Sequence, residues 1–333
     1  MLSEQIDKKQ FCPTLSDISD EHIKKVVNKL KGESDKETLA NILEWQHRNI
    51  EYWKERWISA KFLFIWILVF VVLVILIVLK KLPFLLVFFL AVLFFGIPLF
   101  LLFYLLISYT NFYRNEKSLR KRIKKISKKI LDTINLLGSV DPCKILEYKQ
   151  AICRDYARFT ASLLLNLYPE VYFAKFFSHV ATGVKIDDTI YMIDQKLPIC
   201  TLDKWLEVWN KEEITLYKLE KISKNGSIEL KFSKVGQYPR NKTRNDYEEY
   251  LQKLECEINK MFGLNKPLKK GKPVKIKLKN FVQYWENDEI VQYSILRLLK
   301  NKIEAELCGN ISRLAKIELV QLDKDLTLNI YLE

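Results

Sequence analysis

Hydrophobic residues are concentrated in one block in the first third of the chain. Residues 62–79 are eighteen apolar residues in succession, and after two lysines a second run of twenty-six uncharged residues covers residues 82–107. About 20 apolar residues cross a hydrocarbon core of roughly 30 Å. A helix at the surface of a soluble protein needs a polar face, and neither run has one. The pattern predicts a two-helix transmembrane hairpin over residues 62–107.

Positive charge flanks this block unevenly. Four lysines or arginines precede the first run, nine follow the second within residues 114–129, and two lie in the connecting loop. Because positive flanks stay on the cytoplasmic side, we expect a multi-pass protein of the cell membrane with both termini in the cytoplasm. The segment 114–129 has a net charge of +8, and we expect it to lie as a helix on anionic lipid headgroups. Trp53, Trp57 and Tyr109 suit anchoring at the interface, whereas Trp66 lies inside a run and suits it least.

Outside the block, apolar residues recur with the periodicity of a helix in some segments and of a strand in others. Ser34 and Glu37 have the spacing of a capping box, and the helix that starts there is expected to continue into the first span. Apolar residues recur at helical spacing after Cys153 until Pro169, although this pattern could extend back to residue 145. Strand patterns follow at residues 171–177, 179–186 and 189–194.

The C-terminal portion is α+β in its pattern. Strands at 214–221 and 227–234 flank a hairpin signal at Asn225-Gly226. Helices near 244–262 and 287–307, a strand at 274–278 and a final strand or hairpin at 319–332 follow, and together they either complete the sheet or form an appended domain. The predicted segments are an N-terminal helical part at 1–61, two transmembrane helices at 62–107, a basic juxtamembrane helix at 108–139, a core at 140–210 and an extension at 211–333.

Composition narrows the classes of function. The net charge of +14 requires an acidic partner, which is anionic lipid or nucleic acid. Nucleic acid is the less favoured partner, because the charge is concentrated beside the membrane block and no nucleic-acid-binding motif accompanies it. Six scattered cysteines without a CxxC pair are typical of reduced cytosolic thiols. One histidine of three, His179, lies beyond the block, so a multi-histidine metal site is excluded there, and we expect no cofactor.

The two strands at 179–194 predict a specific side-chain arrangement. If Asp187 and Asp188 form a two-residue turn, the numbers of paired residues sum to 375, so that Ala181 lies opposite Asp194. His179 is then on the same face as Asp194 and diagonal to it, at about 7–8 Å between Cα atoms. A slip of one residue would put the two side chains on opposite faces.

A carboxylate-bound imidazole is what a thiol nucleophile requires. The carboxylate fixes the tautomer, and the imidazole accepts the thiol proton. Cys153 stands near the start of its predicted helix, where the aligned backbone dipoles favour a thiolate. A single cysteine on an apolar face is commonly a core residue, and a single histidine is commonly structural. Cys153, His179 and Asp194 in this order are stronger evidence for a catalytic site than any of the three residues alone.

The residues around this set resemble a known superfamily. The matching stretches are Cys153-Arg154-Asp155-Tyr156-Ala157, Ser178-His179-Val180, Ile193-Asp194 and Lys196-Leu197-Pro198. They resemble the transglutaminase-like superfamily of papain-type cysteine enzymes over about residues 140–210. The resemblance implies a helix opened by the cysteine and packed on an antiparallel sheet, with Cys153 as nucleophile, His179 as general base and Asp194 as its orienting partner.

The resemblance departs from the family pattern at one place. Residues before the cysteine are usually small or include glycine, and here they are Gln150-Ala151-Ile152. The backbone N–H of Cys153 is the expected oxyanion donor, and the second donor is unassigned.

We expect a membrane-anchored cysteine peptidase or amidohydrolase that acts by thiol acyl transfer on a peptide or protein, with transfer to an amine as the other outcome. The alternative is a non-enzymatic membrane scaffold or binding protein that retains the fold.

Overall fold

The structure, a computed structural model, describes residues 2–78, 84–135, 138–177, 179–224, 227–240, 247–264, 272–308 and 310–333. The predicted lysine loop at 80–81 and the turn Asn225-Gly226 lie outside these residues. The chain divides into two compact units. The first unit comprises Met1–Ile50, Asp141–Lys149 and Cys153–Glu333, and the second comprises Glu51–Val140 and Gln150–Ile152.

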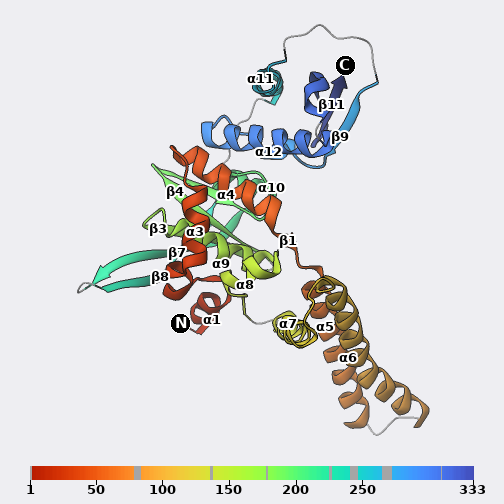
Figure 1. The fold of residues 1–333 in the computed structure, drawn as a ribbon. Helices are drawn as coiled ribbons and strands as arrows, with labels where there is room; N and C mark the ends of the chain where they lie inside the picture. Colours follow the sequence, from red (N-terminus) through yellow and green to blue (C-terminus); the bar gives the residue numbers. More distant parts are fainter. Residues whose placement is uncertain are drawn as a thin grey trace. The chain divides into compact units, whose positions relative to one another are not determined.

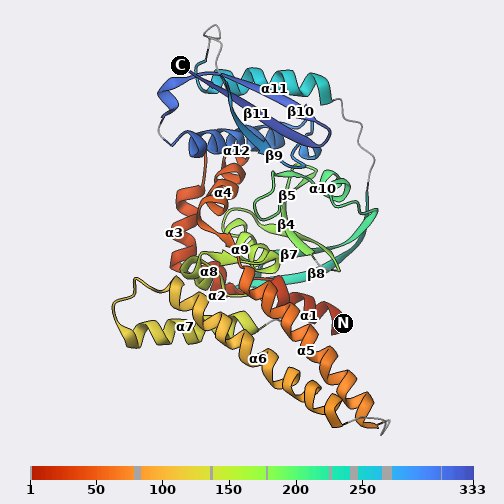
Figure 2. The same cartoon turned by 90° about the vertical axis from the view of Figure 1, so that its right-hand side faces the viewer.

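The first unit is built on a six-stranded antiparallel sheet in the order β6-β5-β4-β3-β7-β8. Its strands are β3 (Glu170–Phe176), β4 (His179–Ile186), β5 (Thr189–Ile193), β6 (Cys200–Thr201), β7 (Glu213–Lys224) and β8 (Ser227–Pro239). The pairs Thr182↔Ile193 and Ile186↔Thr189 both sum to 375, so the predicted register of the hairpin is confirmed. Figures 1 and 2 show helix α9 (Cys153–Leu164) beside β4.

Both faces of this sheet carry a hydrophobic core. On one face, Ala181, Met192 and Leu216 pack with Trp205 of helix α10 (Leu202–Val208). On the other face, Phe11 of helix α1 (Leu2–Phe11) packs against Phe173, with the ring centroids 5.0 Å apart. The alternation of side chains along β3 and β4 supplies both cores.

The remaining helices of the first unit before β3 are α2 (Leu15–Ser19), α3 (Glu21–Leu30), α4 (Asp35–Asn49) and, after the apolar block, α8 (Pro142–Tyr148). Side chains cap the N-termini of α2, α3 and α4, whereas Asp141 at the start of α8 makes no side-chain capping bond. Ser34 caps α4 by accepting from the backbone N–H of Glu37. The Glu37 carboxylate accepts from the N–H of Glu33, so only half of the predicted capping box forms.

The C-terminal extension is expected either to complete the sheet of the core or to form an appended domain, and parts of it do each. Strands β7 and β8 complete the six-stranded sheet, and a separate antiparallel sheet has the order β10-β11-β9. The elements after β8 are α11 (Tyr247–Met261), β9 (Val274–Leu278), α12 (Glu289–Leu307), β10 (Leu314–Leu322) and β11 (Asp325–Leu332). Helix α12 lies beside α4 (Figure 1), and Arg297 pairs with Glu44 across them.

The second unit contains the apolar block. Its helices are α5 (Lys54–Val78), α6 (Phe84–Phe112) and α7 (Leu119–Ile134). By length and composition, α5 and α6 are each able to cross a membrane, over Lys54–Ile75 and Phe88–Phe112. The prediction that the capped helix continues into the first span is wrong. Helix α4 ends at Asn49, and strand β1 (Glu51–Tyr52) pairs in parallel with β2 (Gln150–Ala151) before α5 begins.

The helix pair has a specific polar contact at its centre. Pro98 lies inside α6 and has no N–H with which to bond the carbonyl four residues earlier. The indole Nε1–H of Trp66 donates to that carbonyl, Phe94 O, at 3.0 Å. Trp66 therefore joins α5 to α6. Trp53 and Tyr109, predicted as interfacial anchors, are buried, and Trp53 Nε1–H donates to the Tyr109 hydroxyl at 3.0 Å.

Candidate active site

Local structure brings the three predicted site residues together. Cys153 is the first residue of α9, His179 is the first residue of β4, and Asp194 directly follows β5. Helix α9 starts at Cys153 because Lys149 adopts a left-handed conformation that ends α8, and β2 intervenes. The Thr182 hydroxyl donates to Ala157 O at 2.8 Å and thereby fixes α9 against β4.

The imidazole of His179 is held by the Asp194 carboxylate. Nε2 lies 2.9 Å from Oδ1 and 2.8 Å from Oδ2. The side chains are 8% and 2% exposed, so the pair is largely removed from water. In such surroundings a charge-assisted hydrogen bond is stronger than at the surface. The diagonal arrangement predicted from the hairpin register is therefore present.

The electrostatics of His179 involve both other residues. Burial by itself would lower the pKa of His179. Hydrogen bonds to Asp194 and to Cys153, together with the negative charges of these partners, outweigh burial and raise the pKa to about 9. The imidazolium is thus the favoured form at neutral pH. Since Asp194 occupies Nε2, Nδ1 is the ring nitrogen that remains for the Cys153 thiol.

Aromatic rings enclose this imidazole. The centroid of the Trp209 ring lies 4.4 Å from that of His179, and Trp205 stacks at 6.0 Å. Phe176, at the end of β3, lies 5.5 Å away. Trp205 also donates from Nε1–H to Asp194 Oδ2 at 2.8 Å. These rings exclude water and fix the plane of the imidazole.

The C-terminal extension braces the same site. Glu286 accepts from the Thr201 N–H at 2.8 Å and from the Thr201 hydroxyl at 2.6 Å. Thr201 is the N-cap of α10, the helix that carries Trp205. The Tyr191 hydroxyl of β5 donates to Asp288 at 2.8 Å. The extension therefore holds two elements that adjoin Asp194.

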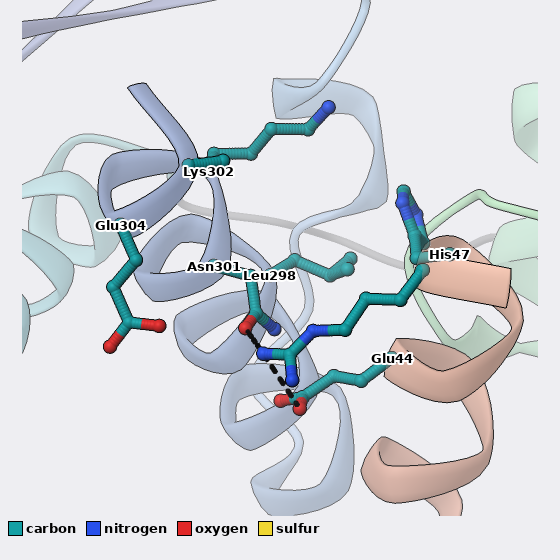
Figure 3. A pocket seen from close by; sticks show the side chains of 8 residues that line it. Glu44, His47, Leu298, Asn301, Lys302 and Glu304 are labelled. Carbon is teal, nitrogen blue, oxygen red and sulfur yellow. Dashed lines mark hydrogen bonds and ion pairs between the residues drawn. The ribbon is translucent and has the colours of Figure 1, made fainter. Parts of the chain in front are cut away.

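A second pair of hydrogen bonds connects α4 to the loop after Asp194. His47 Nε2 bonds Lys196 O at 2.5 Å, and Lys196 Nζ donates to His47 O at 3.0 Å. Burial lowers the pKa of His47 to about 4, so it is neutral and donates from Nε2. Figure 3 shows His47 at the edge of a cavity of about 480 Å³ between α4 and α12, where Arg48 bonds Asn301 and Glu44.

The other cysteines have different surroundings. Burial raises the pKa of the Cys12 and Cys200 thiols, and burial with a hydrogen bond to Asp20 raises that of Cys143 to about 12. Cys256 and Cys308 are exposed at the surface. Cys153 is the thiol that contributes to the raised pKa of His179. Within the described part of the chain, no three His, Cys, Asp or Glu side chains are grouped so as to hold a metal ion.

Several residues of the site were not predicted from the sequence. The sequence predicts no role for Trp205, Trp209 or Glu286. A signal was present for Trp205, because it lies eleven residues after Asp194, just inside the next helix. Nothing in the sequence linked Glu286 to this site, since its partner Thr201 is 85 residues away.

Comparison with known proteins agrees with this architecture. The model of a family described as a transglutaminase-like domain matches residues 21–222. The chain is 34% identical over 219 residues to the UPF0252 protein MJECL39 of Methanocaldococcus jannaschii, a match that covers 64% of this chain and 60% of that protein. It is 30% identical over 195 residues to the UPF0252 protein PH0672 of Pyrococcus horikoshii, covering 50% and 63%. The chain thus matches about three fifths of the length of each relative. No solved structure matches it.

Proposed function

The chain belongs to the transglutaminase-like domain family, and on that premise we propose that it is a membrane-anchored cysteine enzyme that cleaves an amide bond of a peptide or protein. Cys153 is the nucleophile, His179 the general acid and base, and Asp194 the residue that orients the imidazole. The observation that carries the proposal is the buried imidazole hydrogen-bonded to Asp194, whose pKa is raised by the neighbouring Asp194 and Cys153 side chains.

The order of steps in the proposed reaction follows from the proton that His179 carries. The Cys153 thiolate attacks the amide carbonyl carbon, and the sulfur–carbon bond forms as the carbonyl oxygen becomes negative. The N–H of Cys153 at the start of α9 would stabilise that oxygen. The tetrahedral intermediate collapses, the carbon–nitrogen bond breaks, and His179 gives its Nδ1 proton to the leaving amine. Water then attacks the thioester carbon while His179 accepts its proton. The sulfur–carbon bond breaks, which releases the acid and returns the Cys153 thiolate and the His179 imidazolium.

Membrane anchoring is the second part of the proposal. Helices α5 and α6 would span the bilayer as a hairpin. The first unit draws its residues from before α5 and after α6, so both flanks lie on one side of the membrane. The thirteen positive residues on these flanks, against two in the loop, favour the cytoplasmic side. A cytosolic substrate and reduced cysteines are consistent with that side.

The test uses the full chain in detergent with fluorogenic peptide amides and protein substrates. The wild type should form a thioester on Cys153, which intact-protein mass spectrometry detects as an added acyl mass. Cys153→Ala should lose both the adduct and turnover. Cys256→Ala is the matched control, because it removes an exposed thiol from another helix and should leave turnover unchanged.

Two outcomes separate the alternatives. Incorporation of a fluorescent amine into an acyl donor, in place of hydrolysis, would identify transfer to an amine as the reaction. If a broad set of amide substrates gives neither adduct nor turnover, while the substituted and wild-type chains bind the same cellular proteins, the enzyme is excluded and the chain is a scaffold that retains the fold.

A further inference from the structure

Helix α7 has one face that packs within its own unit. Ile126, Lys129 and Thr133 are buried, and these residues face the α5–α6 pair. The Thr133 and Tyr109 hydroxyls are 2.6 Å apart. After the last turn, Arg56 of α5 donates from Nη2 to Asn135 O at 2.8 Å. These contacts fix the rotation of α7 about its axis and so determine which residues face outwards.

The outward part of α7 includes an apolar stripe. Leu119, Ile123 and Ile134 are 70%, 56% and 46% exposed. At 100° per residue, Leu119, Ile123 and Ile134 fall within about 60° of one another around the helix. Exposed aliphatic side chains grouped in this way mark an interaction surface.

Basic side chains border this stripe. Arg120, Lys121, Lys124 and Lys128 are all exposed, and they project from the helix on the side away from the buried face. A helix with an aliphatic stripe and a lysine- and arginine-rich polar face is typical of those that lie in a membrane interface. The acidic component such a face requires is supplied by anionic lipid headgroups.

The stripe is continuous with the apolar helix pair. Ile134 lines an apolar groove of about 260 Å³ together with Phe62 and Trp66 of α5 and Pro98 of α6. Figure 2 shows α7 next to α5 and α6. A side chain at the end of α7 therefore shares its surroundings with residues of the two candidate spans.

We propose that α7 lies in the surface of the bilayer that α5 and α6 cross, with its apolar stripe among the acyl chains and its basic side chains on the phosphates of anionic phospholipid. This inference rests on the proposed membrane anchoring. A nucleic acid would neutralise the basic side chains but would leave the aliphatic stripe in water. Lipid accounts for both halves of the exposed surface.

The stripe is tested by site-specific photo-crosslinking in the full chain. p-Benzoylphenylalanine replaces Ile123 in one variant and the exposed Lys24 of α3 in a control, and each protein is placed in liposomes of phosphatidylcholine and phosphatidylglycerol. We expect lipid adducts from position 123, detected by mass spectrometry, and at least tenfold fewer from position 24. Equal yields at the two positions, or protein adducts alone from position 123, would overturn the proposal.

The basic face is tested by lipid retention in native mass spectrometry. The variant in which Lys121, Lys124 and Lys128 are glutamine should lose preference for phosphatidylglycerol over phosphatidylcholine by about fivefold per lysine. Glutamine at the exposed Lys24, Lys25 and Lys29 of α3 makes the same charge change in the first unit and should keep the preference. Unchanged retention in the α7 variant, or loss of RNA binding in place of lipid retention, would contradict the proposal.

Failure of this proposal is distinguishable from failure of membrane anchoring. The variants in α7 keep α5 and α6 intact. If the chain stays in the liposomes after a carbonate wash but position 123 gives no lipid adduct, α5 and α6 span the membrane and α7 does not lie in its surface. If the wash removes the chain, the anchoring itself is wrong.

Discussion

Two tryptophans, one in each unit, each donate an indole hydrogen bond to an oxygen of another segment. Trp205 donates to a carboxylate oxygen of Asp194 at 2.8 Å, and Trp66 donates to the backbone carbonyl of Phe94 at 3.0 Å. The first acceptor is an anion that already binds His179. The second is a neutral carbonyl that has lost its helical donor to Pro98.

The difference between the acceptors separates two uses of the same donor. Beside Asp194, the indole N–H helps to hold a negative charge in place, and the fixed charge controls the proton on His179. Beside Phe94, the indole N–H removes an unsatisfied carbonyl, which would be costly in an apolar medium. The first contact therefore acts on the electrostatics of the His179 imidazole and the second on the pairing of α5 with α6.

The largest expected effect comes from the anion itself. Asp194→Asn keeps the side-chain shape but removes the charge that supports the imidazolium, and we expect turnover to fall ~10²–10⁴-fold. Steady-state kinetics with the amide substrate measures this. Asp188→Asn, at a fully exposed turn position, is the control. A fall below threefold in Asp194→Asn would mean that the carboxylate does not control His179.

The pH dependence of the free energy of unfolding tests the effect of the Asp194 charge on His179. His179 has a folded pKa of about 9, above the ordinary 6.5, so its bonds add most stability below pH 6.5 and lose that contribution as pH rises through 9. The difference in the free energy of unfolding between wild type and His179→Gln should shrink over this interval, by a few kcal/mol at most. Urea titrations at pH 6, 7.5 and 9 measure it. A difference that grows with pH would mean that Asp194 and Cys153 do not raise the pKa of His179.

Paired substitutions at the two tryptophans sharpen the comparison. Trp205→Phe should lower the free energy of unfolding by about 1.5–3 kcal/mol, because the lost bond is to a charged acceptor. Trp66→Phe should cost about 0.6–2 kcal/mol in lipid and leave turnover unchanged, since it affects helix pairing alone. If both variants lose turnover equally, the two contacts do not have separate roles.

The smallest effect is expected at the brace from the C-terminal extension. Glu286→Gln leaves one amide oxygen to accept two bonds from Thr201, and the free energy of unfolding should fall by about 1 kcal/mol. Turnover should fall severalfold without a change in the shape of its pH profile, because Glu286 acts through α10. Glu289→Gln, on the exposed start of α12, is the control. A shifted pH profile would place Glu286 closer to the reaction.

The local geometry of the site could be predicted from the sequence because short-range rules determine it. A two-residue turn at Asp187-Asp188 fixes the register of its hairpin, and the register puts His179 and Asp194 on one face. Apolar periodicity located α9, and unbroken apolar runs located α5 and α6. Each of these features depends on residues that are close together in the sequence.

Contacts between distant segments account for what was missed. Helix α4 ends early because Glu51 and Tyr52 pair with Gln150 and Ala151, a contact between segments on opposite sides of the apolar block. Asp7, in a polar segment without an apolar pattern, accepts from the Tyr217 hydroxyl at 2.5 Å. Local propensity yields to such tertiary contacts, and a single sequence does not reveal them.

The most direct test of the central claim is the alkylation rate of each cysteine with iodoacetamide across pH 4 to 9, read by peptide mass spectrometry on the full chain in detergent. Thiolates react and thiols do not. We predict that Cys153 is alkylated at pH 6 at least tenfold faster than the more exposed Cys256 and Cys308, and that His179→Gln abolishes this advantage. If Cys153 follows the same pH curve as Cys256 in the wild type, no thiolate–imidazolium pair exists and the proposed enzyme is contradicted.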